Sequence, residues 1–306
     1  MDKQFDILVA GEINPDLILS GDVTPEFGQK EKIIDSAALT IGSSSVIFAC
    51  GATRLGLRVG FVGVCGADLF GHFMLDEMTH HGIDISFVRV DSARPTGLSV
   101  ILDRSGDRSI LTYPGTISSL KANEVTDEML SQSRHLHVSS YFLQTALQPG
   151  LPDLFERARN LGLTISLDPN WDPTGEWANF DQLLPRVDVF FPNENEALAL
   201  TTEATSAQAL AALGRMAGTV AIKRGSLGAV AYQRTQTAIV EALPVQVVDT
   251  VGAGDSFDAG FLCGWLNGWS LAKSLRMGVV CGSLSTRAAG GTAAQPDLIE
   301  AMPYLT

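Results

Sequence analysis

Short apolar runs bounded by turn residues alternate with amphipathic segments along most of the chain. The apolar runs are mostly continuous, which is typical of strands buried on both faces of a sheet. The six runs expected to form strands are 5–11, 59–66, 135–140, 163–168, 187–192 and 219–225. Helical spacing occurs at about 44–56, 68–81, 150–161, 194–201 and 206–217. This order predicts an α/β fold with a mainly parallel, doubly wound sheet.

Two stretches depart from this rhythm, because their polar and apolar residues tend to alternate: 12-EINPDLILSG-21 and 97-GLSVILDRSGDRSILTYPG-115. Alternation is typical of strands with one face on protein and the other toward water or a ligand. We therefore expect a small β-sheet lid made of two insertions, approximately 12–40 and 92–116, within a single domain spanning 1–306. Period 2 also groups side chains on one side of each strand: Asn14 with Asp16, and Ser109 with Leu111 and Tyr113.

Composition limits the classes of partner. The formal net charge is −13, and 45% of the residues are hydrophobic. So acidic a chain lacks the basic face needed to bind nucleic acid or an anionic membrane surface, which favours a small-molecule partner. The widely spaced cysteines have neither a Cys-x-x-Cys pair nor a histidine at ligand spacing, which indicates buried free thiols. Without a leader pattern or a run of about 20 apolar residues, a cytoplasmic location is expected.

The stretch 249-DTVGAGDSFDAGF-261 carries the clearest sign of chemistry. It follows 245-VQVV-248, which we interpret as a strand end, and its GAGD opens a helix with apolar residues at helical spacing. Gly252 and Gly254 leave the first backbone N–H groups open to an anion, to which the helix dipole adds attraction. Asp255 is then placed to accept the proton of a hydroxyl that attacks a phosphoryl group. Out of context, a G-x-G-D pattern more often marks an ordinary helix start with a capping aspartate.

In context, D-T-V-G-A-G-D-S-F-x-A-G-F resembles the C-terminal signature of the ribokinase-like (PfkB) family of carbohydrate kinases. The segment 42–71, followed by 76-DEMTHHGID-84, is similar to the family's opening βαβ region with its G-x-D-x-x-G turn. Further matches follow in the family's order: 11-GEINPDLIL-19, 168-DPN-170, 192-PNENEA-197 and 223-KRGSLGA-229. The likeness covers nearly the whole chain and implies a ribokinase-like three-layer sandwich with a small lid.

The resemblance implies roles for the residues at the phosphoryl group. Asp255 is the general base, and the backbone of Gly252, Ala253 and Gly254 forms the anion hole. Asn193 and Glu196 match an N-x-x-E element that serves phosphate and magnesium–water networks, with Glu196 reaching Mg²⁺ through water. Without the other motifs, these two residues fit a helix N-terminal box after Pro192.

The resemblance also implies an ATP site and a cation site. The turn formed by Gly225, Ser226 and Gly228 resembles the loop beside the nucleotide phosphates and ribose, where Lys223 adds positive charge, although a G-x-x-G turn alone is most often a hairpin. A potassium site in relatives corresponds to the Asp249 carboxylate and to four backbone carbonyls: Val251, Ser285, Ala288 and Gly290. Asp249 also fits a strand-end turn.

For the acceptor, Asn14, Asp16, Gly42, Ser43 and Ser44 match the two sugar-binding segments of the family. Carboxylate and amide groups suit a polyol because each makes paired hydrogen bonds. The sequence departs from the common G-G-x-x-x-N pattern, with Ile41 in place of the first glycine and Val46 in place of the asparagine. This puts one sugar contact in doubt and widens the choice of acceptor.

Two lid residues, Arg108 and Tyr113, are placed to contact an acidic or open-chain sugar, as in relatives that act on 2-keto-3-deoxygluconate. Arg108 also fits a solvated surface arginine, and Tyr113 a residue packed under the lid.

Taken together, the residues and the resemblance predict an ATP- and Mg²⁺-dependent kinase that phosphorylates a hydroxyl of a small sugar or sugar acid. The rivals are a nucleoside kinase of the same fold and a sugar- or nucleotide-sensing protein that has lost catalysis. A lid sheet with an apolar side further predicts a homodimer formed through the lid.

Overall fold

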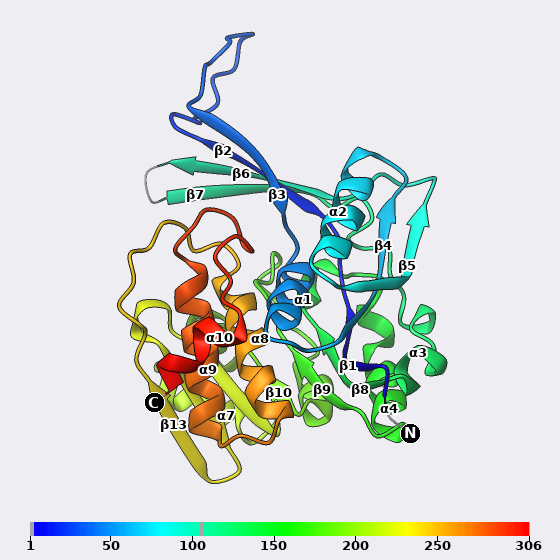
Figure 1. Cartoon of the computed structure of the whole chain (residues 1–306), viewed down its shortest axis with the longest axis vertical. Coiled ribbons are helices and arrows are strands. Elements are labelled where there is room, and N and C mark those ends of the chain that lie inside the picture. The colour runs from blue at the N-terminus through cyan, green and yellow to red at the C-terminus, as the bar shows by residue number, and fades with distance from the viewer. Residues whose placement is uncertain (1–2, 105–106, 306) are drawn as a thin grey trace.

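The computed structural model describes residues 3–104 and 107–305. Its largest element is a nine-stranded sheet with the order β13-β12-β11-β10-β9-β8-β1-β4-β5 (Figure 1). Neighbouring strands from β11 to β5 are parallel, whereas β11, β12 and β13 are joined antiparallel at one edge. The strands are β1 (Phe5–Ala10), β4 (Val59–Gly66), β5 (Asp84–Asp91), β8 (Ser133–Val138), β9 (Thr164–Leu167), β10 (Val189–Phe190), β11 (Thr219–Lys223), β12 (Ala229–Gln233) and β13 (Gln236–Val240). The predicted mainly parallel sheet is confirmed.

Each of the six predicted apolar runs contains a strand of this sheet. Strands β1 and β4 are buried along their whole length, as continuous apolarity predicts. The other three strands, β5, β12 and β13, were not among the predicted runs. β5 and β13 form the two edges of the sheet, and β12 lies next to β13. The sequences of all three strands mix polar with apolar residues.

Helices cover both faces of the sheet and complete three layers. On one face, Phe48, Phe257 and Phe261 belong to a core cluster shared by α1, α2, α8, α9 and α10. On the other face, Phe155 and Phe190 belong to a cluster shared by α3, α4, α5, α6 and α7. The bounds are α1 (Ser44–Arg54), α2 (Leu69–His80), α3 (Asp127–Ser131), α4 (Leu151–Asn160), α5 (Phe180–Leu183), α6 (Glu194–Thr201), α7 (Ser206–Leu213), α8 (Ala253–Leu266), α9 (Leu271–Ser285) and α10 (Leu298–Ala301). Each fully buried phenylalanine stabilises these layers by about 1.5–3 kcal/mol.

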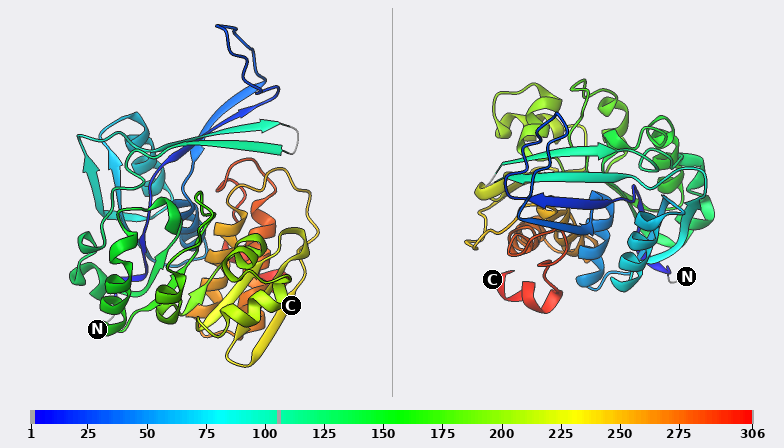
Figure 2. Two further views of the ribbon diagram at one scale, coloured as in Figure 1. Left: turned by 180° about the vertical axis from the view of Figure 1, so that it is seen from behind. Right: turned by 90° about the horizontal axis from the view of Figure 1, so that it is seen from above.

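A separate four-stranded sheet, which we call the lid, stands over one end of the body (Figures 1 and 2). Its order is β3-β2-β6-β7, from β2 (Pro15–Ser20), β3 (Ser36–Ile41), β6 (Leu98–Arg104) and β7 (Asp107–Tyr113). The parallel pair β2–β6 joins two segments that are far apart in the sequence, as predicted from the alternating stretches. Within the second predicted insertion, residues 105–106 lie outside the described residues.

The interpretation of 245–248 as a strand end is wrong. This segment belongs to neither sheet, and Val247 and Val248 are 57% and 59% exposed. The edge of the large sheet is already closed by the β12–β13 hairpin, so the chain runs instead along the end of α9. There the Val248 N–H donates to the Thr286 carbonyl at 2.8 Å.

The cysteines are free and buried, as predicted. Within the described part of the chain, no helix is both long and apolar enough to cross a membrane.

Candidate active site

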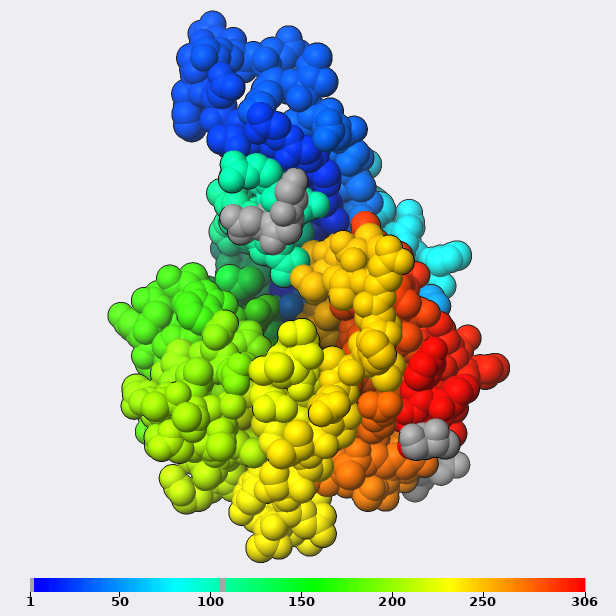
Figure 3. Space-filling view, turned by 90° about the vertical axis from the view of Figure 1, so that its left-hand side faces the viewer, coloured from blue at the N-terminus to red at the C-terminus, as the bar shows by residue number. Residues whose placement is uncertain are grey.

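A cavity of about 1130 Å³ lies between the lid and the carboxyl ends of the parallel strands. Figure 3 shows the recess from one side, below the lid strands. In an open α/β sheet the loops after the strands gather at this edge, which is the usual place for a ligand. Here the loops after β1, β8, β9, β10 and β11 bring polar residues to the cavity: Asn14, Ser140, Asn170, Asn193 and Ser226.

The first turn of α8 points its amino end into this cavity. Gly252 precedes the helix with φ 70°, a left-handed conformation that favours glycine. A Cβ atom at this position would lie 2.7 Å from Gly291 Cα and 2.8 Å from Ile47 Cγ2, so the turn also needs glycine for space. The first N–H groups of a helix have no partner within the helix, and Ala253 and Gly254 both line the cavity. The Ala253 N–H makes a long hydrogen bond of 3.3 Å to the Thr250 carbonyl, which lies just before the helix. The turn is therefore built to attract an anion.

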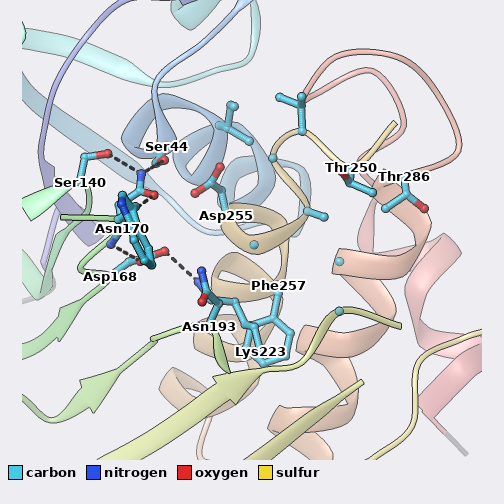
Figure 4. Close-up of a pocket in the computed structure, with 18 of the residues that line it drawn as sticks. Ser44, Ser140, Asp168, Asn170, Asn193, Lys223, Thr250, Asp255, Phe257 and Thr286 are labelled. Atoms are coloured by element: carbon cyan, nitrogen blue, oxygen red, sulfur yellow. Dashed lines mark hydrogen bonds and ion pairs between the residues drawn. The ribbon is translucent and has the colours of Figure 1, made fainter. Parts of the chain in front are cut away.

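Asp255 follows in the same turn, and its side chain points into the cavity beside Ser44 (Figure 4). Burial raises the pKa of Asp255 well above its ordinary value, and the negative charges of Asp168 and Glu12 add to this effect. Lys223 and a hydrogen bond with the Ser44 hydroxyl act in the opposite direction. A carboxylate with a raised pKa beside an anion site is suited to accept a proton from a hydroxyl group.

One side of the cavity is lined by lid residues with hydrogen-bonding side chains. Asn14 and Asp16 are 4% and 7% exposed and both face the cavity, as period 2 predicted. Burial raises the pKa of Asp16 to about 7, with Arg108 opposing the shift and Glu12 and Asp249 increasing it. Arg108 also lines the cavity, with Nη1 3.9 Å from Asp249 Oδ1, so it is not merely a solvated surface residue.

The segment before α1 supports these lid residues. A Cβ atom at Gly42 would lie 2.2 Å from Asp16 Oδ1, so only glycine lets this carboxylate approach the backbone. Ser43 caps α1: its Oγ accepts a hydrogen bond from the Val46 N–H at 3.1 Å and donates to the Glu12 carbonyl at 2.7 Å. Ser44 is left facing the cavity near Asp255 (Figure 4).

The opposite side of the cavity contains Asn193 and Glu196 at the start of α6. The two residues form the helix N-terminal box that was the simpler interpretation of their spacing: the Asn193 N–H donates to Glu196 Oε2 at 2.8 Å, and the Glu196 N–H donates to Asn193 Oδ1 at 2.9 Å. Both also line the cavity, and burial and Asp168 raise the pKa of Glu196 to about 7 against the effect of Lys223.

The glycine turn after β11 extends this side. Gly225 and Gly228 have φ values of 55° and 82°, and together with Ser226 they line the cavity next to an apolar strip. The strip consists of Ala242, Leu243, Pro244, Val245 and Val247. An apolar strip beside a glycine turn suits a flat ring attached to phosphates.

Comparison with known proteins agrees with this geometry. Residues 48–298 match the model of the pfkB family carbohydrate kinases. The chain belongs to this family. It is a carbohydrate kinase, a phosphotransferase with an alcohol group as acceptor.

Among the relatives of this kinase, the 2-dehydro-3-deoxygluconokinase of Bacillus subtilis is 33% identical over 87% of this chain and 86% of the relative. An ATP-dependent ribose-1-phosphate kinase of Halopiger xanaduensis is 28% identical over 94% of each chain. The crystal structure of a putative ribokinase II from E. coli superposes with a TM-score of 0.87 at 25% identity, covering 100% of this chain and 99% of the other. The ribokinase-like fold is therefore confirmed.

The residues predicted for a monovalent cation come from two segments, 249–251 and 285–290, which a hydrogen bond between Asp249 and Gly290 joins. The carboxylate of Asp249 accepts from the Val251 N–H at 3.0 Å and from the Gly290 N–H at 2.9 Å. These bonds give Asp249 the turn role that was the alternative interpretation. Ser285 is buried in the last turn of α9, and Ala288 follows it in the same connection.

The structure corrects the position expected for Tyr113. Arg108, Ile110 and Thr112 line the cavity, so the alternation along β7 turns Ser109, Leu111 and Tyr113 to the other face of the lid. Tyr113 is 53% exposed there and does not line the cavity. Arg108 and Tyr113, although both assigned to the acceptor, therefore lie on opposite faces.

Two cavity residues of the kinase were not assigned from the sequence. Asn170 Nδ2 donates to Ser44 Oγ at 3.0 Å and to Ser140 Oγ at 3.1 Å (Figure 4). Glu12 is 2% exposed and accepts from the hydroxyls of Ser43 and Ser45 at 3.0 and 2.6 Å. Both belong to segments that match the family, 168-DPN-170 and 11-GEINPDLIL-19, and that match was the only signal for them.

Proposed function

We propose that this kinase transfers the γ-phosphate of ATP to a hydroxyl group of a small sugar or sugar acid, with Asp255 as the general base. The observation that carries the proposal is the position of Asp255. Its carboxylate stands at the amino end of α8, between the polar lid residues on one side and the Asn193–Glu196 box and glycine turn on the other. A hydroxyl bound under the lid thereby meets a base and an anion site at once.

The proposed sequence of events uses residues of one cavity. Asn14 and Asp16 hold acceptor hydroxyls, and Asp255 takes the proton from the hydroxyl that attacks the γ-phosphate. The N–H groups of Ala253 and Gly254 stabilise the negative charge of the phosphoryl group in transfer. ATP as the donor agrees with the name of the ATP-dependent relative and with the glycine turn and apolar strip.

Magnesium fits the donors on the nucleotide side. In the described part of the chain, no group of three or more His, Cys, Asp or Glu side chains is arranged to hold a metal ion. That composition suits Mg²⁺ held chiefly by ATP oxygens and water, with Glu196 buried at the cavity wall as the carboxylate that a bound water would reach. The ion would neutralise charge on the phosphates.

A nucleoside is the second candidate acceptor, because part of the acceptor side is apolar. Trp171 lines the cavity and is 55% exposed, and the apolar Leu143 and Ile110 also belong to the lining. An aromatic side chain of this kind can stack on a base.

The test is ADP formation from ATP and Mg²⁺ with a panel of pentoses, hexoses, keto-deoxy sugar acids and nucleosides, in potassium and in sodium buffers. The proposal expects saturable turnover with a sugar or sugar acid, faster in potassium if an ion binds beside Asp249. Turnover with nucleosides alone would replace the proposed acceptor class. Nucleotide binding without turnover on any acceptor would favour the sensing-protein alternative.

The proposal includes a homodimer formed through the outer face of the lid. The strand register places Leu39, Leu17, Val100 and Leu111 in one row across all four strands. Leu39 and Leu111 are 36% and 59% exposed, so the row offers an apolar surface that a second lid can cover. The molar mass in solution, measured by light scattering, checks this arrangement.

Replacing Asp16 with asparagine is expected to stabilise the fold at alkaline pH while weakening acceptor binding. The folded protein holds the Asp16 proton up to a pKa of about 7, compared with 3.8 for an ordinary aspartate. Ionisation therefore costs stability as the pH rises from about 4 to about 7, and the full cost is present above that window. We expect Asp16→Asn to be more stable than wild type by about 2–4 kcal/mol at pH 8, and by little at pH 4.

Urea unfolding at pH 4, 5.5 and 8 measures this difference, and the acceptor KM is expected to rise at least about tenfold. The exposed Asp76→Asn on α2 is the control and should stay within about 0.5 kcal/mol of wild type. A difference between Asp16→Asn and wild type that does not change with pH would show that ionisation of Asp16 is not the cause.

A further inference from the structure

A buried charge cluster lies directly beneath the catalytic turn and has no part in the chemistry described so far. Lys223 Nζ donates to Asp168 Oδ2 at 2.8 Å and to Asp258 Oδ2 at 3.2 Å. The three side chains are 13%, 7% and 1% exposed. They come from the end of β11, the residue after β9 and the second turn of α8, so the cluster joins three separate elements.

Lys223 is also tied to a fourth element through its backbone. Its N–H donates to the Pro192 carbonyl at 3.0 Å, and it pairs with Asn193 in an isolated bridge. Its side chain passes under the first turn of α8, where a Cβ atom on Gly254 would lie 3.4 Å from Nζ. One residue thus contacts both the Asn193–Glu196 box and the turn that presents Asp255 (Figure 4).

The two carboxyl groups that contact Lys223 differ in their pKa shifts. Burial raises the pKa of Asp258 well above its usual range, and the neighbouring Asp168 charge adds to this against the effect of Lys223. The raised pKa of Asp258 favours its protonated form, and the interaction between the Asp258 and Asp168 side chains lowers the pKa of Asp168. Burial alone would raise the pKa of Asp168 too, but Lys223 and the hydrogen bond from Asp258 hold it below the ordinary value. Lys223 Nζ thus lies between two buried carboxyl groups, within 2.8 Å of Asp168 Oδ2 and 3.2 Å of Asp258 Oδ2.

The position of Lys223 between these two carboxyl groups favours a structural role over the nucleotide-binding role that the resemblance implied. Moving Nζ to a nucleotide phosphate would leave Asp168 charged, buried and without its cation, which is strongly unfavourable. A closed cluster with short bonds to two carboxyl groups instead behaves as a fixed structural joint.

We propose that Lys223 is a positioning residue, which clamps the first turn of α8 to the ends of β9 and β11 and so fixes the distance from Asp255 and the anion hole to the Asn193–Glu196 box. The inference rests on the proposed role of Asp255 as the base. Phosphoryl transfer depends on the alignment of base, acceptor and phosphate, so a small displacement of α8 lowers the rate of the chemical step. In the proposed function, the nucleotide contacts the glycine turn and the apolar strip, and the side chain of Lys223 is not among these contacts.

The test compares Lys223→Met with wild type in steady-state kinetics and in direct binding of ADP by calorimetry. The expected result is a fall in kcat on the order of 10²-fold, with the KM for ATP and the Kd for ADP changed less than about threefold. Lys273→Met, the same substitution at an exposed position on α9, is the control and should leave all three constants unchanged. An increase in the KM for ATP of tenfold or more at unchanged kcat would make Lys223 a nucleotide ligand and overturn the proposal.

A second variant distinguishes the loss of positioning from the destabilising effect of an unpaired buried charge. Lys223→Met/Asp168→Asn removes the cation and the carboxylate together, so its melting temperature should lie closer to that of wild type than does that of Lys223→Met. Its kcat should remain low, because the joint is still missing. Recovery of kcat in the double variant would mean that Lys223 only neutralises Asp168, which overturns the positioning role.

Asp255→Asn in the same assay distinguishes a failure of the positioning role of Lys223 from a failure of the proposed function. If Asp255→Asn is inactive and Lys223→Met keeps the wild-type kcat, only the positioning role fails. If Asp255→Asn retains the wild-type kcat, the proposed function fails and the inference fails with it.

Discussion

Asp255→Asn is expected to lower kcat by about 10²–10⁴-fold while nucleotide binding is retained. Asparagine has nearly the same shape as aspartate but cannot accept the proton of the acceptor hydroxyl at neutral pH. The carboxylate stands in the cavity beside Ser44, at the amino end of α8. The measurement is acceptor-dependent ADP formation, with ADP binding followed by calorimetry. Retention of more than about a tenth of the wild-type kcat would contradict the role of Asp255 as the base.

The pH dependence of kcat/KM provides an independent test of the role of Asp255. A general base must be ionised, and the pKa of Asp255 lies well above its ordinary value of 3.8. The wild-type kcat/KM should therefore fall as the pH is lowered through this raised pKa, and rise to a plateau above it. For the same reason, the ionised carboxylate costs stability above the ordinary pKa, so Asp255→Asn should melt no lower than wild type at pH 8.

The chain offers a matched control for the simpler explanation that Asp255 only caps a helix. Asp153 is the third residue of α4, as Asp255 is the third residue of α8, and it is exposed. Asp153→Asn should lose the same interaction with the helix dipole, about 0.3–1 kcal/mol, and keep its activity. Equal loss of activity in both variants would indicate a general effect on helix stability.

Gly252→Ala is expected to lower kcat by about 10²–10³-fold, the usual effect of removing an anion-hole donor. Gly252 has φ 70°, and a Cβ atom there would lie 2.7 Å from Gly291 Cα. Backbone atoms cannot move aside as a flexible side chain can, so the first turn of α8 must shift. The N–H groups of Ala253 and Gly254 would then no longer point at the phosphoryl group. The KM and kcat of the variant, measured with the acceptor found in the panel, check this expectation.

Gly268 provides the control for backbone strain alone. It follows the other end of α8 with φ 72°, and a Cβ atom added there would meet open space within 4 Å. Gly268→Ala should cost about 1 kcal/mol of stability because of the positive φ at this position, and it should leave kcat unchanged. Part of the stability cost of Gly252→Ala has the same cause. If both variants lost activity equally, strain rather than the anion hole would explain the effect of Gly252→Ala.

Local patterns in the sequence predicted much of the fold and of the site. Continuous apolar runs identified β1 and β4, because strands covered on both faces need apolar residues at every position. Alternation placed Asn14 and Asp16 on one side of the lid, and both face the cavity. The glycines at 252 and 254 marked the start of a helix, and α8 begins at Ala253 in the structure.

Other predictions failed where the answer depended on distant parts of the chain. The segment 245–248 is apolar enough for a strand, but the sheet edge it would need is occupied by β13. Tyr113 alternates correctly with its neighbours along β7, yet alternation does not say which face of the lid meets the cavity. Both errors arise because a local pattern defines the periodicity of an element but does not determine which other elements pack against it.

The sequence by itself determined the turn that opens α8, because a glycine-rich helix start with an aspartate is a local structure that neighbouring residues encode. The tertiary structure alone decided what surrounds it. Lys223 meets Asp168, 55 residues away, and Asn170 meets Ser44, 126 residues away, only because the parallel strands end at one edge of the sheet. Burial at that edge then sets the charge of each carboxyl group, since the cost of removing a charge from water depends on packing and partners that no local pattern contains.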